Sequence, residues 1–275
     1  MLPSLAFIGA GKVATALALR LQELGYPIAS VTSRTPASAE SLAQLLNCPV
    51  TDNPAADLIF LTLPDDILLS EAPHWAGKKN NTALVHTSGV HSLDVFGTDH
   101  AARIGSFHPM YPFRAGTRFQ GDEQILFGIE ASDTALETQL IDLARHLDGT
   151  PAILNPGSKT QYHAAAVMAS NYLVVLFAAS LNLLQSAGVP APQAQAALNR
   201  LMQGNVDNLR TLLPDQALTG PIARGDIATV ERHLQALEES DYQNLYRVLG
   251  EAAVQIASQL SAEKRQALHK LLLKD

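Results

Sequence analysis

The stretch Leu5-Ala-Phe-Ile-Gly9-Ala-Gly11-Lys-Val-Ala14 decides the fold of this chain. An apolar run predicts a strand, and the G-x-G-x-x-A pattern leads from it into an amphipathic stretch that predicts a helix. Gly9 permits a tight turn, Gly11 lets the backbone approach a pyrophosphate, and the small Ala14 permits close helix packing. The helix N-terminus supplies amide donors and positive potential. We therefore expect a bound dinucleotide, the alternative being a glycine-rich turn without a ligand. The expected contacts are Gly9, Ala10, Gly11, Lys12 and Val13.

The residues that follow the second predicted strand select the cofactor. An NAD site usually has Asp or Glu about 20 residues beyond the glycines, to hold the ribose 2′-hydroxyl. Here the sequence is Ser33-Arg34-Thr35, without an acid. A guanidinium and hydroxyls suit a 2′-phosphate, which a carboxylate would repel. We expect NADP (NADPH) bound through Ser33, Arg34 and Thr35, the alternative being that Arg34 is a solvated loop residue.

Apolar and amphipathic runs alternate in the first half of the chain, which predicts a mainly parallel, doubly wound α/β sheet of about eight strands. The expected strands are Leu5–Gly9, Ile28–Ser33, Pro49–Thr51, Leu58–Leu63, Ala83–Thr87, Ala102–His108, Gln124–Glu130 and Pro151–Leu154. The expected helices here are Lys12–Leu24, Ala37–Leu46 and Thr134–Leu147.

From Asn155 onward the pattern is helical, so Asn155-Pro156-Gly157 predicts a boundary between a cofactor-binding domain, 1–154, and an all-helical substrate and dimerisation domain, 155–275. The expected helices are Ser158–Ala187, Ala191–Leu212, Ile227–Glu238, Asp241–Leu260 and Ala262–Leu272.

Polar residues just beyond the carboxyl ends of predicted strands are candidates for the substrate site, because open α/β sheets bind ligands there. Leu63 and Pro64 are expected beneath the nicotinamide. Asp65 and Asp66 are expected to have an N-cap and first-turn role in the following helix, the alternative being a pair of acid-base carboxylates. The further candidates are Ser88 and Gly89, from His86-Thr87-Ser88-Gly89, and His108, as a general acid or base or a structural histidine. One cysteine and no acid cluster argue against a metal at His86 and His91.

The long helix opens with polar residues on an otherwise apolar segment. Lys159 and His163 are four residues apart and Asn171 lies eight further on, so the three share one face. Either they bond to neighbouring helices, or they face the cleft between the domains and act on a carbonyl or imine. We expect Lys159 or His163 to be the proton donor. Arg224 is a candidate for a substrate anion or a partner subunit, and Asp226 is expected to cap the next helix.

Composition limits the partners. The formal charge of −7 and a pI near 5.7 argue against nucleic acid. The single cysteine, Cys48, cannot form an intramolecular disulfide. The first residues lack the basic region and long apolar stretch of a secretory signal, so we expect a cytoplasmic protein. Only 16% of the residues are charged, and the apolar stretch Ala164–Leu184 is interrupted by Ser and Asn. We expect that stretch to lie in a core or a homodimer interface of the C-terminal helices, and not in a membrane.

The motifs also resemble known families. GAGKVA, SRT after the second strand and the helical tail resemble the pyrroline-5-carboxylate reductase and β-hydroxyacid dehydrogenase group. HTSG, FHP-x-x-PF, K-x-x-YHAAAV-x-ASNYL and GP-x-x-RGD resemble the Rossmann-like proteins that carry domain of unknown function 2520. The resemblance implies a Rossmann domain followed by an all-α domain like that of 6-phosphogluconate dehydrogenase. It also implies cofactor contacts at Gly9, Gly11 and Arg34, with Lys159 and Asn171 near the reacting carbon.

The leading hypothesis is an NADP-dependent oxidoreductase that acts on a small carbonyl, hydroxy-acid or imine substrate. The nicotinamide supplies the hydride, so the protein has to align the substrate and supply a proton. One alternative is a non-catalytic NADP(H)-binding sensor or scaffold. A second is an enzyme like prephenate dehydrogenase, which the HPM at His108 resembles. The sequence does not identify the substrate.

Overall fold

The computed structural model describes residues 1–79, 82–119, 124–238 and 240–273. They form two compact units, Met1–Tyr172 and Leu173–Asp275. The last strand ends at Ile153, where the sequence predicts the change from strands to helices. Helix α5 (Lys159–Ser186) contributes residues to both units. The domain boundary at residues 154 and 155 stays a prediction.

The first unit is built on a seven-stranded sheet with the order β2-β1-β3-β4-β5-β6-β7. Neighbouring strands run parallel except for the antiparallel pair β5 and β6. The predicted eighth strand at 49–51 is wrong. Val50 makes only an isolated bridge to Val31, and Pro49 has no N–H to donate to a ladder. The strands are β1 (Leu5–Ile8), β2 (Ile28–Thr32), β3 (Leu58–Leu61), β4 (Ala83–His86), β5 (Arg103–Pro109), β6 (Leu126–Ala131) and β7 (Thr150–Ile153).

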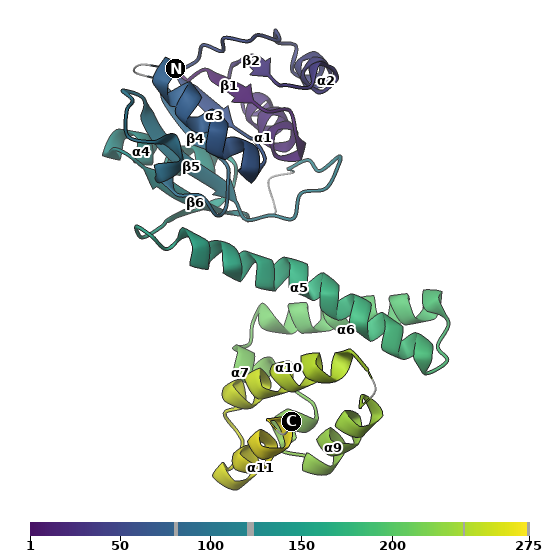
Figure 1. Cartoon of the computed structure of the whole chain (residues 1–275). Coiled ribbons are helices and arrows are strands. Elements are labelled where there is room, and N and C mark those ends of the chain that lie inside the picture. The colour runs from purple at the N-terminus through teal and green to yellow at the C-terminus, as the bar shows by residue number, and fades with distance from the viewer. Residues whose placement is uncertain (80–81, 120–123, 239, 274–275) are drawn as a thin grey trace. The chain divides into compact units, whose positions relative to one another are not determined.

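Helices cover both faces of this sheet (Figure 1). Helices α1 (Lys12–Glu23), α2 (Pro36–Leu46) and α4 (Thr134–His146) pack on one face, around a row of stacked and tilted phenylalanines. Helix α3 (Asp65–Lys78), which the sequence analysis did not delimit, and the 3-10 helix η1 (Leu93–Phe96) pack on the other. The predicted doubly wound, Rossmann-like arrangement is confirmed.

The turn between β1 and α1 requires glycine at its first position. Gly9 has a φ of +108°, and a Cβ there would lie 2.4 Å from the carbonyl oxygen of Thr62. Thr62 follows β3, and its hydroxyl donates to the carbonyls of Ile8 and Gly9 at 3.2 Å each. The turn is therefore fastened to the end of the neighbouring strand, which fixes the direction in which α1 begins.

The second unit is helical, as predicted. Its buried core includes Val230, Val254 and Leu268. Asp226 caps α9, accepting from the Thr229 N–H at 3.1 Å, which confirms the predicted cap. The helices after α5 are α6 (Ala191–Leu209), α7 (Pro214–Ala217), α8 (Pro221–Arg224), α9 (Ile227–Ala236), α10 (Tyr242–Ile256) and α11 (Ala262–Leu272).

Helix α5 differs from the expectation of a core helix. By length and composition it is able to span a bilayer, but one such helix is weak evidence for a membrane segment. Most of its apolar stretch is exposed in the single chain, including Tyr172, Val174 and Val175. The expectation that it lies in the core of the chain is wrong, and burial between two copies stays a prediction.

Candidate functional site

The N-terminus of α1 is open to an anion. Gly11 is its N-cap, no side chain caps it, and its first turn contains no acid. The first amide groups of a helix have no partner within the helix, so these donors are available to a phosphate. A Cβ on Gly11 would meet nothing within 4 Å, which leaves open space beside the turn. These features fit the pyrophosphate of a dinucleotide.

The residues predicted for the adenosine end follow β2. Arg34 and Thr35 are exposed, and the Ser33 hydroxyl accepts from the Thr35 N–H at 3.3 Å. Thr35 is the N-cap of α2, whose first turn contains no acid. A cavity of about 340 Å³ lies beside the turn and is lined by Ala10, Thr15, Ala37, Ser38, Ser41, Leu42 and Leu45. The cavity lining thus contains hydroxyls and no carboxylate, and the exposed guanidinium of Arg34 belongs to the same loop after β2.

A larger cavity, of about 430 Å³, joins the dinucleotide turn to the predicted substrate residues. Its size lies within the range of about 300 to 1,000 Å³ that is usual for small-molecule sites. It lies entirely among residues of the first unit. We call it the catalytic cavity. Its lining is Gly11, Lys12, Val13, Thr62, Leu63, Pro64, Asp65, Thr87, Ser88, Gly89, His108, Pro109, Tyr111, Phe113 and His163.

The His86-to-Gly89 turn forms one wall of this cavity. His86 is fully buried, and its Nδ1 accepts from the Ser88 N–H at 3.2 Å. The Ser88 hydroxyl accepts from the N–H groups of Val90 and His91, at 3.2 and 3.1 Å. Burial, and then the charge of Lys159, hold the pKa of His86 well below its usual range. A neutral His86 thus shapes the turn that presents Ser88 and Gly89 to the cavity.

Two histidines meet opposite this turn. The rings of His108, on β5, and His163, on α5, lie edge to face with centroids 6.2 Å apart. A Cβ on Gly89 would lie 2.5 Å from Cδ2 of His163 and 2.8 Å from Nε2 of His108. The absent side chain at position 89 lets both rings approach the turn. The structure therefore brings together three of the predicted site residues, His108, His163 and Gly89.

Lys159 lies outside this group. Its side chain is 2% exposed and does not line the catalytic cavity. Its ammonium donates to Glu130 Oε2 at 2.9 Å and to the hydroxyl of Ser106. Glu130 and Ser106 are direct partners across β6 and β5. Burial lowers the pKa of Lys159, and Glu130 opposes that shift. We therefore treat Lys159 as a buried charge that fastens the start of α5 to β5 and β6, outside the cavity.

The other predicted residues have different surroundings. Asn171 is exposed and accepts from the Ser170 hydroxyl at 2.9 Å, outside the cavity lining. Arg224 belongs to the second unit, where its carbonyl accepts from Lys264. The N-cap of α3 is Pro64, so a cap by Asp65 or Asp66 is wrong; both lie in the first turn, and Asp65 also lines the cavity. Sequence reasoning missed Glu130, Ser106 and Tyr162.

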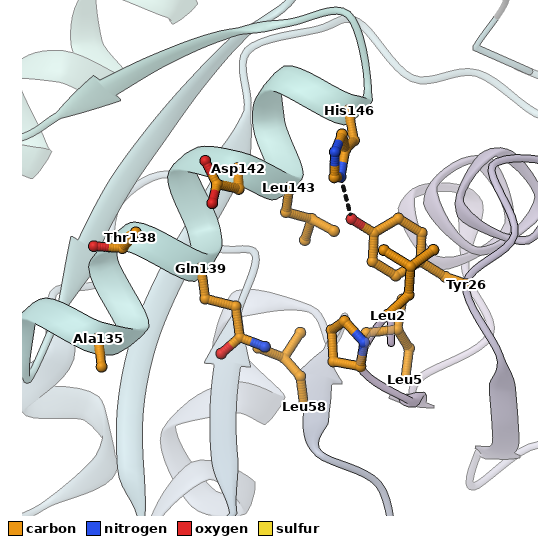
Figure 2. A pocket seen from close by; sticks show the side chains of 11 residues that line it. Leu2, Leu5, Tyr26, Leu58, Ala135, Thr138, Gln139, Asp142, Leu143 and His146 are labelled. Carbon is orange, nitrogen blue, oxygen red and sulfur yellow. Dashed lines mark hydrogen bonds between the residues drawn. The ribbon is translucent and has the colours of Figure 1, made fainter.

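A cavity of about 360 Å³ opens at the other edge of the sheet, where Leu5 and Leu58 begin β1 and β3. Figure 2 shows its lining, with the hydroxyl of Tyr26 bonded to Nδ1 of His146 at 2.6 Å. Leucines make up much of its apolar lining, and α4 supplies most of its polar side chains. The dinucleotide turn follows the opposite ends of the strands, so this cavity plays no part in the cofactor site.

Comparison with known proteins shows which class of protein this chain resembles. Residues 4–86 match the family model described as NADP oxidoreductase, coenzyme F420-dependent. Residues 125–253 match domain of unknown function DUF2520. Fold and matches define an NAD(P)-dependent oxidoreductase of the Rossmann type. More narrowly, the chain combines a segment that matches the NADP oxidoreductase model with one that matches DUF2520, which confirms the resemblance seen in its motifs. No curated protein matches the chain by sequence.

Solved structures agree with this class. A proposed NADP oxidoreductase from Bacteroides fragilis is 29% identical, with a TM-score of 0.76 over 92% of this chain and 98% of that one. A protein from Thermotoga maritima is 27% identical with the same score and coverage. A pyrroline-5-carboxylate reductase from Streptococcus pyogenes is 16% identical, with a TM-score of 0.64 over 94% and 99% of the two chains. At that identity the likeness concerns the fold alone.

Proposed function

We propose that this chain is an NADPH-dependent reductase of a small carbonyl or imine compound. One observation carries the proposal: the dinucleotide turn, at Gly11, and the paired His108 and His163 line one cavity. The bound nicotinamide supplies the hydride. The match to the NADP oxidoreductase model ends at residue 86, before either histidine, so it supports the dinucleotide half of the proposal. Among solved structures of the same fold are imine reductases, such as one from Myxococcus stipitatus at 18% identity.

Each group of cavity residues has a separate role in the proposed reaction. In this proposal the turn would hold the pyrophosphate, and Leu63 and Pro64, which line the same cavity, would contact the nicotinamide half of the cofactor. His108 and His163 face the substrate end. When the carbon of a C=O or C=N group accepts hydride, its oxygen or nitrogen gains charge and takes up one proton. His163 lines the cavity and is our candidate for that proton donor.

Turnover tests this function directly. The purified chain is expected to oxidise NADPH with at least one member of a panel of small keto acids, aldehydes and cyclic imines. Product analysis should show one equivalent of reduced substrate for each NADPH consumed. Tight NADPH binding with no oxidation on the whole panel would favour the sensor or scaffold hypothesis instead.

The cofactor choice predicts a specific effect of Arg34→Asp. The exposed guanidinium is the charged group at the adenosine end, and a charge-assisted bond to a phosphate contributes roughly 1.5 to 3 kcal/mol. We expect the variant to bind NADP at least about tenfold more weakly and NAD almost unchanged, by calorimetric titration. Arg200→Asp, an exposed arginine on α6, is the matched control. Equal affinities of the unmodified chain for NADP and NAD would refute the assignment.

We also propose that the chain forms a homodimer through its C-terminal helices and acts in the cytoplasm. The exposed apolar side chains of α5, with Val174 at 69% and Val175 at 53%, support a second copy as the partner. Each Å² of apolar area removed from water contributes roughly 25 cal/mol. A free Cys48 suits a reducing compartment.

Sedimentation tests the dimer. The unmodified chain is expected to sediment as a dimer at micromolar concentration without detergent, and Val174→Glu to shift it toward monomer. Gln185→Glu adds the same charge at another exposed position of α5 and should leave the dimer intact. A monomeric unmodified chain, or one that needs detergent to stay in solution, would contradict the proposal.

A further inference from the structure

Tyr162 stands directly behind His108, and neither the predicted site nor the catalytic cavity includes it. Its hydroxyl oxygen lies 2.9 Å from Nδ1 of His108, and the two rings are nearly perpendicular, at 86°. The other ring nitrogen, Nε2, is the atom that approaches Gly89 in the cavity wall. Tyr162 therefore contacts the side of the imidazole that faces away from the cavity.

The sheet is shaped to admit this tyrosine. Gly128 on β6 pairs directly with His108 on β5. A Cβ on Gly128 would lie 2.8 Å from both Cζ and the hydroxyl oxygen of Tyr162, so any other residue would displace the ring. Two positions along the same pair, Ser106 and Glu130 receive Lys159, three residues before Tyr162 on the helix. The start of α5 is thus held at two residue pairs of the same strand pair, β5 with β6, which restricts the position of Tyr162.

The hydrogen bond between Tyr162 and His108 has a preferred direction. The phenol oxygen lies closer to Nδ1, at 2.9 Å, than to the carbonyl oxygen of His108, at 3.4 Å. Burial raises the pKa of this phenol to about 12, and the backbone of Gly128 opposes that rise. The phenol therefore keeps its proton at neutral pH, and its best acceptor is Nδ1.

His108 is neutral in these surroundings. Burial lowers its pKa to about 4, the charges of Lys159 and His163 act in the same direction, and Asp65 opposes them. Further ionisable groups nearby are Tyr162 on α5, His86 on β4 and Glu130 on β6. Lys12 and Tyr111 line the same cavity as His108. A neutral imidazole whose Nδ1 accepts a hydrogen bond carries its own proton on Nε2.

We propose that Tyr162 is a positioning residue that holds His108 in the tautomer with its proton on Nε2, so that His108 donates a hydrogen bond to the substrate atom that gains electron density during hydride transfer. This deepens the proposed reductase function and rests on it. A neutral imidazole polarises a carbonyl through such a bond without first being protonated. The inference involves no proton transfer from His108. The role of proton donor remains with His163.

Nitrogen NMR of the full chain with labelled histidine tests the tautomer without a substrate. At pH 7 the His108 ring is expected to be neutral with its proton on Nε2. Tyr162→Phe removes the donor to Nδ1, so the population of the other tautomer should rise several-fold. Tyr26→Phe removes a phenol that bonds to Nδ1 of another histidine, His146, and should leave the His108 tautomer unchanged. A protonated His108, a proton on Nδ1 in the unmodified chain, or an unchanged tautomer in Tyr162→Phe would each overturn the inference.

Turnover gives the second readout once the panel yields a substrate. Tyr162→Phe should lower kcat about tenfold with KM within about twofold, because the donor acts mainly on the charge that develops in the transition state. A changed KM with an unchanged kcat would overturn the role in catalysis. The proposed function fails separately, if the unmodified chain oxidises no NADPH while the NMR still finds the expected tautomer.

Discussion

Replacing Glu130 with glutamine is expected to lower the unfolding free energy of the chain by about 3 to 5 kcal/mol, the usual effect of removing one partner of a buried ion pair. The Lys159 and Glu130 side chains are only 2% and 10% exposed, and their charged atoms lie 2.9 Å apart. In the variant the ammonium stays buried without an opposite charge, and only neutral acceptors, the Ser106 hydroxyl and the glutamine amide oxygen, remain for it. Urea unfolding of the two proteins measures the difference.

The loss should depend on pH in a defined direction. Burial already lowers the pKa of Lys159, and Glu130 limits that fall, so removing Glu130 lowers the pKa in the folded state further. Between the folded and unfolded pKa values, the unfolded chain then binds more protons than the folded chain. Stability must rise with pH in that window. The destabilisation should therefore be smaller at about pH 10, near the unfolded pKa of lysine, than at pH 7.

Two variants complete this test. The double change Lys159→Met with Glu130→Leu removes both charges and should recover much of the lost stability, because an apolar pair avoids the cost of burying ions. Glu40→Gln, at an exposed carboxylate on α2, removes the same charge and should have little effect. If Glu130→Gln is as stable as the Glu40 variant, Lys159 has another partner or is not buried as charged ammonium.

The contrast between Lys159 and His163 shows what helical spacing predicts and what it misses. Their spacing of four residues predicts one shared face of α5, and there Lys159 contacts Glu130 of β6 while His163 lines the cavity. From the sequence we expected neighbouring helices or the cleft between the domains as their partners, and not the strands. The spacing carries no information on the partner of each, which depends on the pairing of β5 with β6. Glu130 at the end of an apolar predicted strand was the available signal, since an acid in such a place needs a partner.

In the fold, too, local features were predictable from the sequence and features that depend on strand pairing were not. The dinucleotide turn was predictable because all of its requirements lie within ten residues, from Leu5 to Ala14. The direction of β6 could not be predicted, because the sequence of one strand does not reveal whether its neighbour runs parallel or antiparallel to it. Yet it is the antiparallel register that sets Gly128 opposite His108 and makes room for Tyr162. Tyr162 was therefore missed although it directly precedes His163.

His108→Leu is expected to lower kcat by roughly 10² to 10³, the effect of removing one hydrogen-bond donor from the site where negative charge develops. The ring lines the catalytic cavity from β5, while the dinucleotide turn lies between β1 and α1. NADPH affinity, measured by calorimetry, should therefore stay within about threefold of the unmodified chain, since no cofactor contact is removed. Steady-state oxidation of NADPH on the panel substrate measures kcat.

Two further variants separate donation from packing at position 108. His108→Gln keeps an N–H donor on a side chain of moderate length and should retain more activity than His108→Leu, although leucine suits an apolar surrounding better. His74→Leu, at an exposed histidine on α3, makes the same replacement away from the cavity and should leave kcat unchanged. If the Gln and Leu variants lose activity equally, His108 acts through shape or as a proton carrier, because a neutral donor would be replaced in part by the glutamine amide.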